Sequence, residues 1–412
     1  MLTQIAIRNF KSLQKVEFEL GQVNLFVGAN GSGKSNLLEA LSFLSSAVDG
    51  RVDDQALLRR GARPSVSDLY KSSFKDSNRE QPIQIRLVWE PSVSEVENSL
   101  LPEDSDIQAT GEPRSLSYEV EFADVRDVRA QPWSYQATLK VAPRQALKLK
   151  NRPLDSLIFS QTWPTATASM IEQLSIVLSD YAIFSANTPT LRAIQSDLTQ
   201  RQPVGLAGGQ LAEAVSEIFS SVSESESDLD LDDLYDLLVD WIDQIDVVPA
   251  SRQLVSASVP TSRHLIRFTD RWLAEGRNHI SAYDASEGVL YVLFIMVLAL
   301  HAKSPRLFAV DHVDQAMHPR LARAATRLFC EYLLASNPAR QALLTTHNPL
   351  VLDGLNLLDD RIRLFTVERN SHGHTCVYRV EVSEEVLNAT QKGLSLSNLW
   401  VMGRLGGVPD IF

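Results

Sequence analysis

Apolar and polar residues alternate along the start of the chain, from Leu2 to Leu20, around a polar turn at 9–12. This period-two pattern predicts two strands joined by that turn. Val23–Val27 is an unbroken apolar run, which is typical of a strand buried on both faces. A glycine-rich stretch follows, and after it leucines fall on one stripe of a helix: Leu37, Leu38, Leu41 and Leu44. We therefore expect a buried strand, a loop and a helix in succession.

Three later segments alternate in the same way and predict an antiparallel sheet with one solvated face: Ile83–Trp89, Leu116–Phe122 and Tyr135–Val141. Residues 150–250 favour helices. Lys and Arg are absent from Gln202 to Ser251, and apolar residues from Leu231 to Ile245 keep a helical period among many acids. We interpret this segment as an acidic amphipathic helix with a solvated face, or alternatively as a docking face for a basic partner.

From 286 onward the pattern returns to alternating helices and strands. It predicts a helix at 288–300 and another at Leu321–Leu334, with strands at Leu307–Val310, Gln341–Leu344, Ile362–Val367 and Val377–Val380. The chain is therefore expected to be α/β. We divide it into an N-terminal lobe at 1–150, a helical insertion at 151–250 and a C-terminal lobe at 251–412.

The glycine-rich stretch fits the phosphate-binding pattern G-x-x-x-x-G-K-[ST] in full, and a strand and a helix flank it as the motif requires. Glycines let successive backbone N–H groups point at phosphate oxygens, and the helix N-terminus adds positive charge. Lys34 is expected to reach the β- and γ-phosphates, and Ser35 to ligate Mg²⁺. The expected ATP-binding residues are Gly28, Ala29, Asn30, Gly31, Ser32, Gly33, Lys34, Ser35 and Asn36.

A P-loop needs a second carboxylate for the metal ion, at the end of another buried strand. The apolar run Leu307–Val310 ends in Asp311 and supplies that carboxylate. We therefore expect Asp311 and Ser35 to share Mg²⁺. An ordinary strand-end cap is the alternative role for Asp311.

Composition narrows the choice of partner. The formal net charge is −12, so any contact with nucleic acid needs a local basic patch. Two basic clusters exist, at Arg59–Arg63 and Arg144–Arg152; we favour a solvated loop for each, with phosphate-backbone contact to DNA or RNA as the alternative. The most apolar stretch, Val289–Leu300, is too short to span a bilayer, and no signal-peptide pattern is visible at the start. Because only two cysteines occur, we expect a cytoplasmic protein without a disulfide framework.

Five features in a fixed order resemble the ATP-binding-cassette (ABC) heads of the SMC, Rad50 and RecF group: Ile7–Ser12, the P-loop, Ser286–Gly288, Asp311 and Thr345–Pro349. The chain is most similar to compact OLD-like and AbiEii-like bacterial AAA-family ATPases, many of them from antiphage defence systems. The resemblance covers about 1–90 and 280–412. It implies a P-loop ABC-ATPase head with an antiparallel β subdomain and a helical insertion.

The resemblance also implies roles for single residues. Two heads would pair face to face around two ATP molecules, as a homodimer or higher oligomer. Ser286 and Gly288 would touch the γ-phosphate bound to the opposite subunit, and His347 would be the switch histidine. Lys11 would lie near the nucleotide. The segment Gln315–Pro319 would cross the dimer interface.

One position departs from the family pattern. The family usually has a Glu directly after the strand-end Asp, where it activates the attacking water, but here that residue is His312. His312 can act as a base, because its ordinary pKa is near neutral, or it can leave a site that binds ATP and cleaves it slowly. We favour slow or regulated hydrolysis, with Asp311, His312 and His347 as the catalytic candidates.

Three functions follow from these features. The favoured one is a nucleotide-gated switch or scaffold that holds a separately encoded effector, in antiphage defence. The second is a RecF-like, ATP-dependent DNA clamp for repair. The third is a scaffold that uses ATP without cleaving it.

Overall fold

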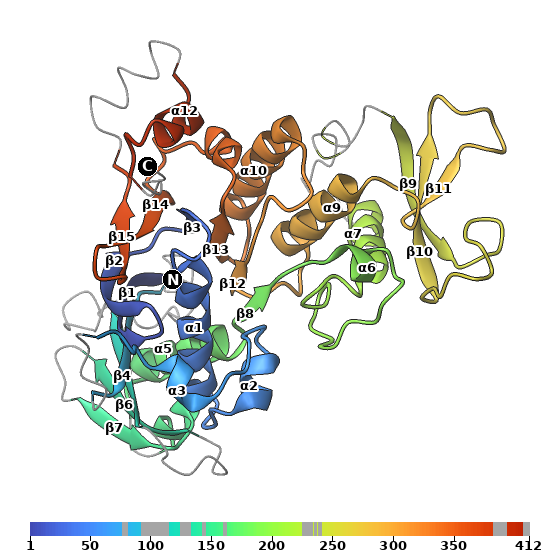
Figure 1. The fold of residues 1–412 in the computed structure, drawn as a ribbon. Helices are drawn as coiled ribbons and strands as arrows, with labels where there is room; N and C mark the ends of the chain where they lie inside the picture. Colours follow the sequence, from blue (N-terminus) through green and yellow to red (C-terminus); the bar gives the residue numbers. More distant parts are fainter. Residues whose placement is uncertain are drawn as a thin grey trace, which may run out of the picture.

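A computed structural model describes residues 1–75, 81–91, 115–123, 133–141, 146–159, 163–224, 234, 237, 241–381 and 394–406. Two six-stranded sheets form most of the molecule, with a smaller three-stranded sheet at its far end (Figure 1). Within the described ranges, no helix is long and apolar enough to span a bilayer.

The first sheet is antiparallel and has the order β2-β1-β4-β5-β6-β7. Its strands are β1 Leu2–Phe10, β2 Leu13–Glu19, β4 Ile83–Trp89, β5 Leu116–Ala123, β6 Ser134–Val141 and β7 Leu147–Lys150. Buried and half-buried residues alternate along β4 and β5, so one face of the sheet packs on the core and the other faces outward. The antiparallel sheet expected from the alternating pattern is therefore confirmed.

The second sheet carries the P-loop and has the order β15-β14-β3-β13-β12-β8. Its strands are β3 Val23–Val27, β8 Ala182–Phe184, β12 Leu307–Val310, β13 Gln341–Thr346, β14 Ile362–Arg369 and β15 Thr375–Arg379. All neighbours are parallel except β14 and β15, which form a hairpin. The strands predicted at Val23–Val27 and Leu307–Val310 are confirmed as β3 and β12. Because both run in the same direction, their carboxyl ends lie at the same edge of the sheet.

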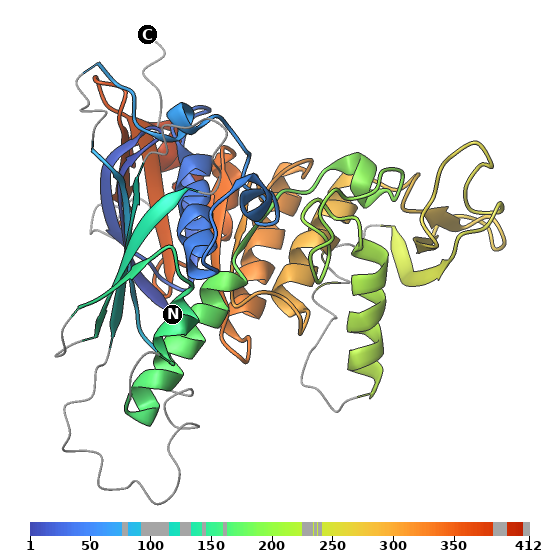
Figure 2. The same cartoon turned by 90° about the horizontal axis from the view of Figure 1, so that it is seen from below.

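Helices cover both faces of this core sheet. Helix α1, Lys34–Val48, lies between the two sheets together with α5, Thr165–Ser179 (Figures 1 and 2). The helices on the other face are α7 Leu211–Glu224, α9 Glu287–Leu300 and α10 Pro319–Leu334. Along β3, Phe26 enters the core on the α1 side while Leu25 and Val27 enter the opposite core. Burial on both faces explains why β3 is uniformly apolar.

Short helices complete the chain: α2 Asp54–Leu58, α3 Ser67–Tyr70, η2 Leu154–Leu157, α6 Thr188–Leu191, η3 Pro349–Gly354 and α12 Leu396–Val401. The third sheet has the order β11-β10-β9, with β9 Ile242–Pro249, β10 His264–Asp270 and β11 His279–Ser281. This sheet projects from the end of the molecule opposite the antiparallel sheet (Figure 2).

The expectation of a helical segment at 150–250 is wrong at two places. Residues 182–184 form β8 of the core sheet, and 242–249 form β9, which pairs with β10. The predicted acidic helix therefore cannot extend to Ile245, and most of its earlier part lies outside the described residues. Ile242, Val247 and Val248 are β-branched residues that favour strands, and the helical spacing of apolar residues there was coincidental.

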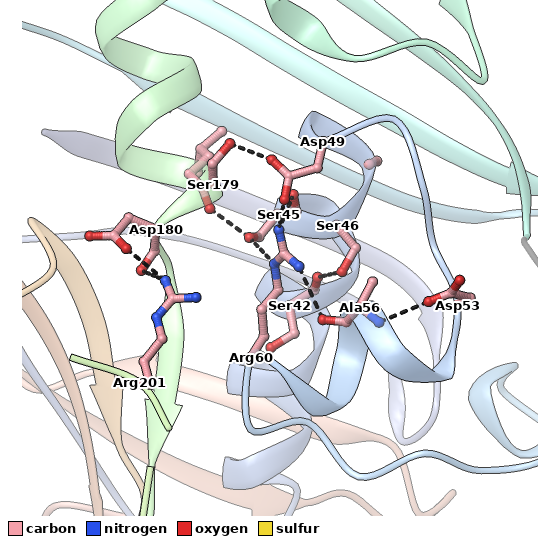
Figure 3. Close-up of polar contacts among 12 residues, drawn as sticks. Ser42, Ser45, Ser46, Asp49, Asp53, Ala56, Arg60, Ser179, Asp180 and Arg201 are labelled. Atoms are coloured by element: carbon pink, nitrogen blue, oxygen red, sulfur yellow. Dashed lines mark hydrogen bonds and ion pairs between the residues drawn. The ribbon is translucent and has the colours of Figure 1, made fainter. Parts of the chain in front are cut away.

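Arg60, which follows α2, joins α2 to α1 (Figure 3). Its guanidinium donates to the Ser45 hydroxyl (2.5 Å) and the Ala56 carbonyl (3.0 Å), and it pairs with Asp49. The Arg60 carbonyl accepts the Ile183 N–H at 2.8 Å. Only 3% of Arg60 is exposed, and burial lowers the pKa of its guanidinium against the pull of Asp49. The interpretation of 59–63 as a solvated basic loop is therefore wrong at Arg60.

Candidate functional site

The P-loop backbone requires glycine at several positions. Gly31 and Gly33 have φ angles of +76° and +111°, in the left-handed region that side chains disfavour. A Cβ on Gly28 would lie 2.1 Å from the Val367 carbonyl oxygen, and one on Gly33 would lie 2.2 Å from the Thr375 hydroxyl. The motif glycines therefore serve two purposes here, which are the turn itself and close packing against the β14–β15 hairpin.

Lys34 is enclosed by the loop that it terminates. Its Nζ donates to the carbonyl oxygens of Gly28 (2.8 Å) and Ala29 (3.0 Å). Burial lowers the pKa of the Lys34 ammonium, while the carboxylates of Asp311 and Asp314 oppose this shift. The ammonium is thus held inside the loop, close to two acids that come from the far end of the chain.

Ser35 and Asp311 meet across the site. The Ser35 hydroxyl donates to the two Asp311 carboxylate oxygens at 2.9 and 3.2 Å, although 276 residues separate them in sequence. Thr345, at the end of β13 between their strands, donates its hydroxyl to the same carboxylate at 2.5 Å. The parallel order β3-β13-β12 brings these three residues to one edge of the sheet.

His312 and His347 lie beside this cluster. Their rings meet edge to face with centroids 5.6 Å apart, and His312 Nε2 is 4.0 Å from the Asp311 carboxylate. His312 has a φ of +60°, and its N–H donates to the Thr345 hydroxyl at 2.9 Å. Among the described residues, His312 Nδ1 has no hydrogen-bond partner. Asp314 is buried and accepts a hydrogen bond from Thr346 at 2.6 Å, so its carboxylate is already engaged.

The β1–β2 turn and the β14–β15 hairpin hold the P-loop from outside. The Thr375 hydroxyl is 2.7 Å from both the Ser32 carbonyl and the Ser12 hydroxyl. Asn36 donates to the same Ser12 hydroxyl at 2.7 Å, and Arg369 donates to the Gly31 carbonyl at 2.8 Å. The loop conformation is therefore fixed by segments from both ends of the chain.

Lys11, expected near the nucleotide, pairs with Glu39 on α1 and lies over the Tyr70 ring, with Nζ 5.2 Å from its centroid. Arg63 donates to the other Glu39 oxygen at 2.8 Å. This hydrogen bond, followed by the charge of Glu39, raises the pKa of the Arg63 guanidinium, and Asp311 adds to the shift. Both cations thus lie along the first part of α1, and contact between Lys11 and a nucleotide stays a prediction.

Ser286 and Gly288 lie at the start of α9, a helix whose later residues belong to the core on the sheet face opposite α1. Ser286 is exposed. Gly288 is buried, and a Cβ there would come within 3.2 Å of the Ala316 carbonyl oxygen and of the Leu321 side chain. The small residue lets the segment after Asp311 pack against this helix end.

The residues present suit a magnesium triphosphate. One carboxylate and one hydroxyl, at Asp311 and Ser35, are the hard oxygen ligands that Mg²⁺ takes when substrate phosphates supply the rest. The Ser32 hydroxyl is buried and lacks a partner within the described part of the chain. Within those same residues, no group of three or more His, Cys, Asp or Glu side chains could hold a metal alone.

Several contacts at this site were not anticipated from the sequence. Thr345 was noted only as part of a motif, and Ser12, Thr375 and Arg369 had no expected contact with the P-loop. A threonine at the end of a buried strand beside β12 is a usable signal for Thr345. Arg369 and Thr375 carry no such signal, because their contacts depend on the pairing of β14 with β3.

Comparison with known proteins agrees with this geometry. A family model described as "AAA domain, putative AbiEii toxin, Type IV TA system" matches residues 23–353. The DNA replication and repair protein RecF of Leifsonia xyli subsp. xyli is 37% identical over 89 residues, which are 21% of this chain and 22% of that protein. The Rad50 ATPase of Saccharolobus solfataricus is 32% identical over 76 residues, which are 18% of this chain and 9% of that protein.

These matches span about a fifth or less of the length of those relatives. Among solved structures, an Smc head domain with an extended coiled coil, bound to the C-terminal domain of ScpA and derived from Pyrococcus furiosus, aligns with a TM-score of 0.52. The alignment covers 95% of this chain and 98% of that chain at 12% identity, which shows a shared fold.

Proposed function

The chain belongs to the AbiEii-type family of AAA domains and has the ABC-type ATPase head of the SMC, Rad50 and RecF group, and from that premise we propose that it is a nucleotide-gated switch. It binds MgATP between the P-loop and Asp311, pairs with a second copy around the nucleotide, and releases or engages a partner protein according to the nucleotide state.

The contact between Ser35 and Asp311 carries this proposal. The Ser35 hydroxyl lies 2.9 Å from the strand-end carboxylate of Asp311, and a serine and an acid in these positions are the residues that would hold Mg²⁺ in a P-loop protein. When ATP is bound, Mg²⁺ would supply the charge that offsets the phosphates. Thr345 would keep the Asp311 carboxylate oriented, and Lys34 would turn from the Gly28 and Ala29 carbonyls toward the phosphates.

Dimer formation accounts for the residues that one chain leaves exposed. Ser286 lies exposed at the start of α9, and α9 packs on the face of the core sheet opposite α1. His347 is exposed at the same sheet edge as the P-loop. A second copy placed face to face would bring Ser286 to the opposite γ-phosphate, and His347 would sense that phosphate from its own side.

Hydrolysis is expected to be slow, because an imidazole replaces the usual carboxylate after Asp311. His312 Nε2 is 4.0 Å from the Asp311 carboxylate, while Nδ1 is buried and has no partner within the described residues, so Nε2 is the nitrogen placed to take a proton from water. Its neighbour Asp314 is engaged by Thr346 and is a poor substitute base. Slow turnover suits a switch that stays closed until a partner or a signal acts on it.

The partner is proposed to be a separately encoded effector protein, in a bacterial defence setting. The family description refers to a toxin of a toxin–antitoxin system, which supports a paired protein. A RecF-like DNA clamp is the alternative, since RecF proteins are among the relatives and Lys148, Lys150 and Arg152 are exposed. Arg144, the first residue of that patch, lies outside the described residues.

Nucleotide binding and phosphate release test the proposal together. Titration calorimetry with MgATP should show binding by the unsubstituted chain and none by Lys34→Ala or Asp311→Asn, while Lys140→Ala on the antiparallel sheet should bind normally. Phosphate release should be slow and should vanish with Lys34→Ala. Equal binding by Lys34→Ala and the unsubstituted chain would contradict the P-loop assignment.

DNA affinity distinguishes the proposed switch from the RecF-like DNA clamp. Anisotropy of a labelled duplex should show at most weak, ATP-independent binding. A DNA clamp would instead bind tightly with ATP and lose about 10³-fold or more in affinity between low and moderate salt.

A further inference from the structure

The β14–β15 hairpin lies at the same sheet edge as the P-loop. Because β14 is parallel to β3, the turn that follows β14 and the loop that follows β3 emerge on the same side. Thr375 and Arg369 flank this turn and bond to the P-loop carbonyls of Ser32 and Gly31. The hairpin is therefore a wall of the nucleotide site, on the side away from β12.

Aromatic rings gather on this wall. The Phe74 and His374 rings lie 4.5 Å apart at an interplanar angle of 58°, and the His372 ring is 5.9 Å from His374. Phe74 and His374 are half-buried, and His372 is exposed. A Cβ on Gly373 would lie 3.3 Å from Phe74, so this glycine lets the phenyl ring approach the turn.

The backbone that carries the rings is fixed by hydrogen bonds within the chain. The Asn370 side chain accepts the N–H groups of both His372 and His374 at 3.0 Å, which fixes the turn. Phe74 follows Ser72, whose hydroxyl donates to the Lys11 carbonyl at 2.8 Å. The two segments thus meet beside the β1–β2 turn, so the backbone on both sides of the ring pair is already ordered before binding.

The direction of the bound nucleotide follows from the metal pair. With MgATP bound, Ser35 and Asp311 would hold the metal end of the triphosphate on the β12 side of the P-loop. The α-phosphate and nucleoside must then leave on the opposite side of β3, which is the side of β14. On that side the nucleoside meets Thr375, His374 and Phe74.

We propose that Phe74 and His374 form the subsite for the nucleotide base, with His372 at its solvent edge. This inference rests on the proposed binding of ATP at the P-loop. The base stacks on the ring pair, because an aromatic face is attractive to any planar nucleobase. The rings therefore increase the affinity for a nucleoside triphosphate, but not the affinity for inorganic triphosphate, which has no base.

Calorimetric titration with two ligands, MgATP and inorganic tripolyphosphate with Mg²⁺, tests the subsite. Phe74→Ala and His374→Ala should each weaken MgATP binding by about five- to fiftyfold, the range expected from losing a base–ring stack. Tripolyphosphate should bind these variants and the unsubstituted chain equally. Phe159→Ala removes an exposed ring between η2 and α5 and should change neither affinity.

The outcomes separate this inference from the function on which it rests. Unchanged MgATP affinity in both variants, or an equal loss of MgATP and tripolyphosphate affinity, would overturn the base subsite and leave ATP binding intact. Failure of the unsubstituted chain to bind either ligand would overturn both proposals. Thermal unfolding of each variant shows whether Phe74→Ala remains folded, and His374→Ala carries the test if it does not.

Discussion

His312 shows how one substitution can alter a site while its framework stays the same. Its backbone is in the left-handed region, and Thr345 fixes both its N–H and the Asp311 carboxylate. The position of the side chain after the strand-end acid is therefore determined by β12 and β13. The chemistry at that position depends on the side chain alone, since an imidazole is a weaker hydrogen-bond acceptor for water than a carboxylate.

His312→Glu should increase the rate of ATP hydrolysis. A carboxylate at this position can orient and deprotonate the attacking water, and a positioned base contributes about 10²-fold or more. Single-turnover phosphate release measures the effect, with MgATP affinity followed in parallel. His312→Gln, which matches the size of Glu without its charge, is the control, and a rise in both variants would refute a base mechanism.

Two glycines of the P-loop should respond differently to alanine. Gly28→Ala places a Cβ 2.1 Å from the Val367 carbonyl, so the loop must move and MgATP binding should fall below detection. In Gly31→Ala the new Cβ meets open space, so the only cost is that of a left-handed φ of +76°. We expect it to lower the free energy of unfolding by about 1–2 kcal/mol. Urea unfolding and calorimetry measure both, and a milder defect in Gly28→Ala than in Gly31→Ala would contradict the packing argument.

At the scale of elements, the sequence predicts those helices, strands and loops whose position depends on a local pattern of residues. The buried strand at Val23–Val27, the P-loop and the strand ending at Asp311 were expected at those residues, because unbroken apolar runs and glycine spacing are local signals. β8 and β9 were missed, since β8 is a three-residue strand and β9 was obscured by a coincidental helical period. The contacts of Arg369 and Thr375 could not be predicted, because they depend on long-range strand pairing.

Arg60 joins α1 to β8, because its guanidinium bonds to Ser45 and its carbonyl accepts the Ile183 N–H. Arg60→Ala removes a buried guanidinium and the donor to the Ser45 carbonyl, while Asp49 loses its cation and keeps the hydrogen bond from Ser179. We expect a loss of about 3 kcal/mol in the free energy of unfolding. Arg201→Ala, which breaks the pair with the half-exposed Asp180, should cost less than about 1 kcal/mol. Urea denaturation measures the free energy of unfolding of both variants. Equal losses would show that the burial of Arg60 does not increase its contribution to stability.

At the scale of the molecule, the nucleotide site is built from both ends of the chain. The P-loop comes from the first 35 residues, Asp311 and His347 come from the last quarter, and β14–β15 closes the outer side. The intervening segment includes the third sheet, which projects away from the site (Figure 2). Under the proposed switch function, the third sheet is the surface far from the site whose position should differ between nucleotide states.

Pairing of two heads should depend on nucleotide and on Ser286. For the unsubstituted chain, light scattering should show the mass of a monomer without nucleotide and about twice that mass with MgATP. Ser286→Arg places a bulky cation at the proposed interface and should keep the chain monomeric while MgATP still binds. Ser258→Arg, in the exposed loop between β9 and β10, is the matched control. A dimer that forms equally well without nucleotide would argue against gating.

The strand order has a consequence for how the protein is made. β3 is synthesised early, but both strands that flank it, β13 and β14, come after residue 340. On the ribosome, an emerging chain therefore carries an apolar central strand with no neighbour until most of the polypeptide has been translated. The nascent strand is therefore a segment for molecular chaperones to shield.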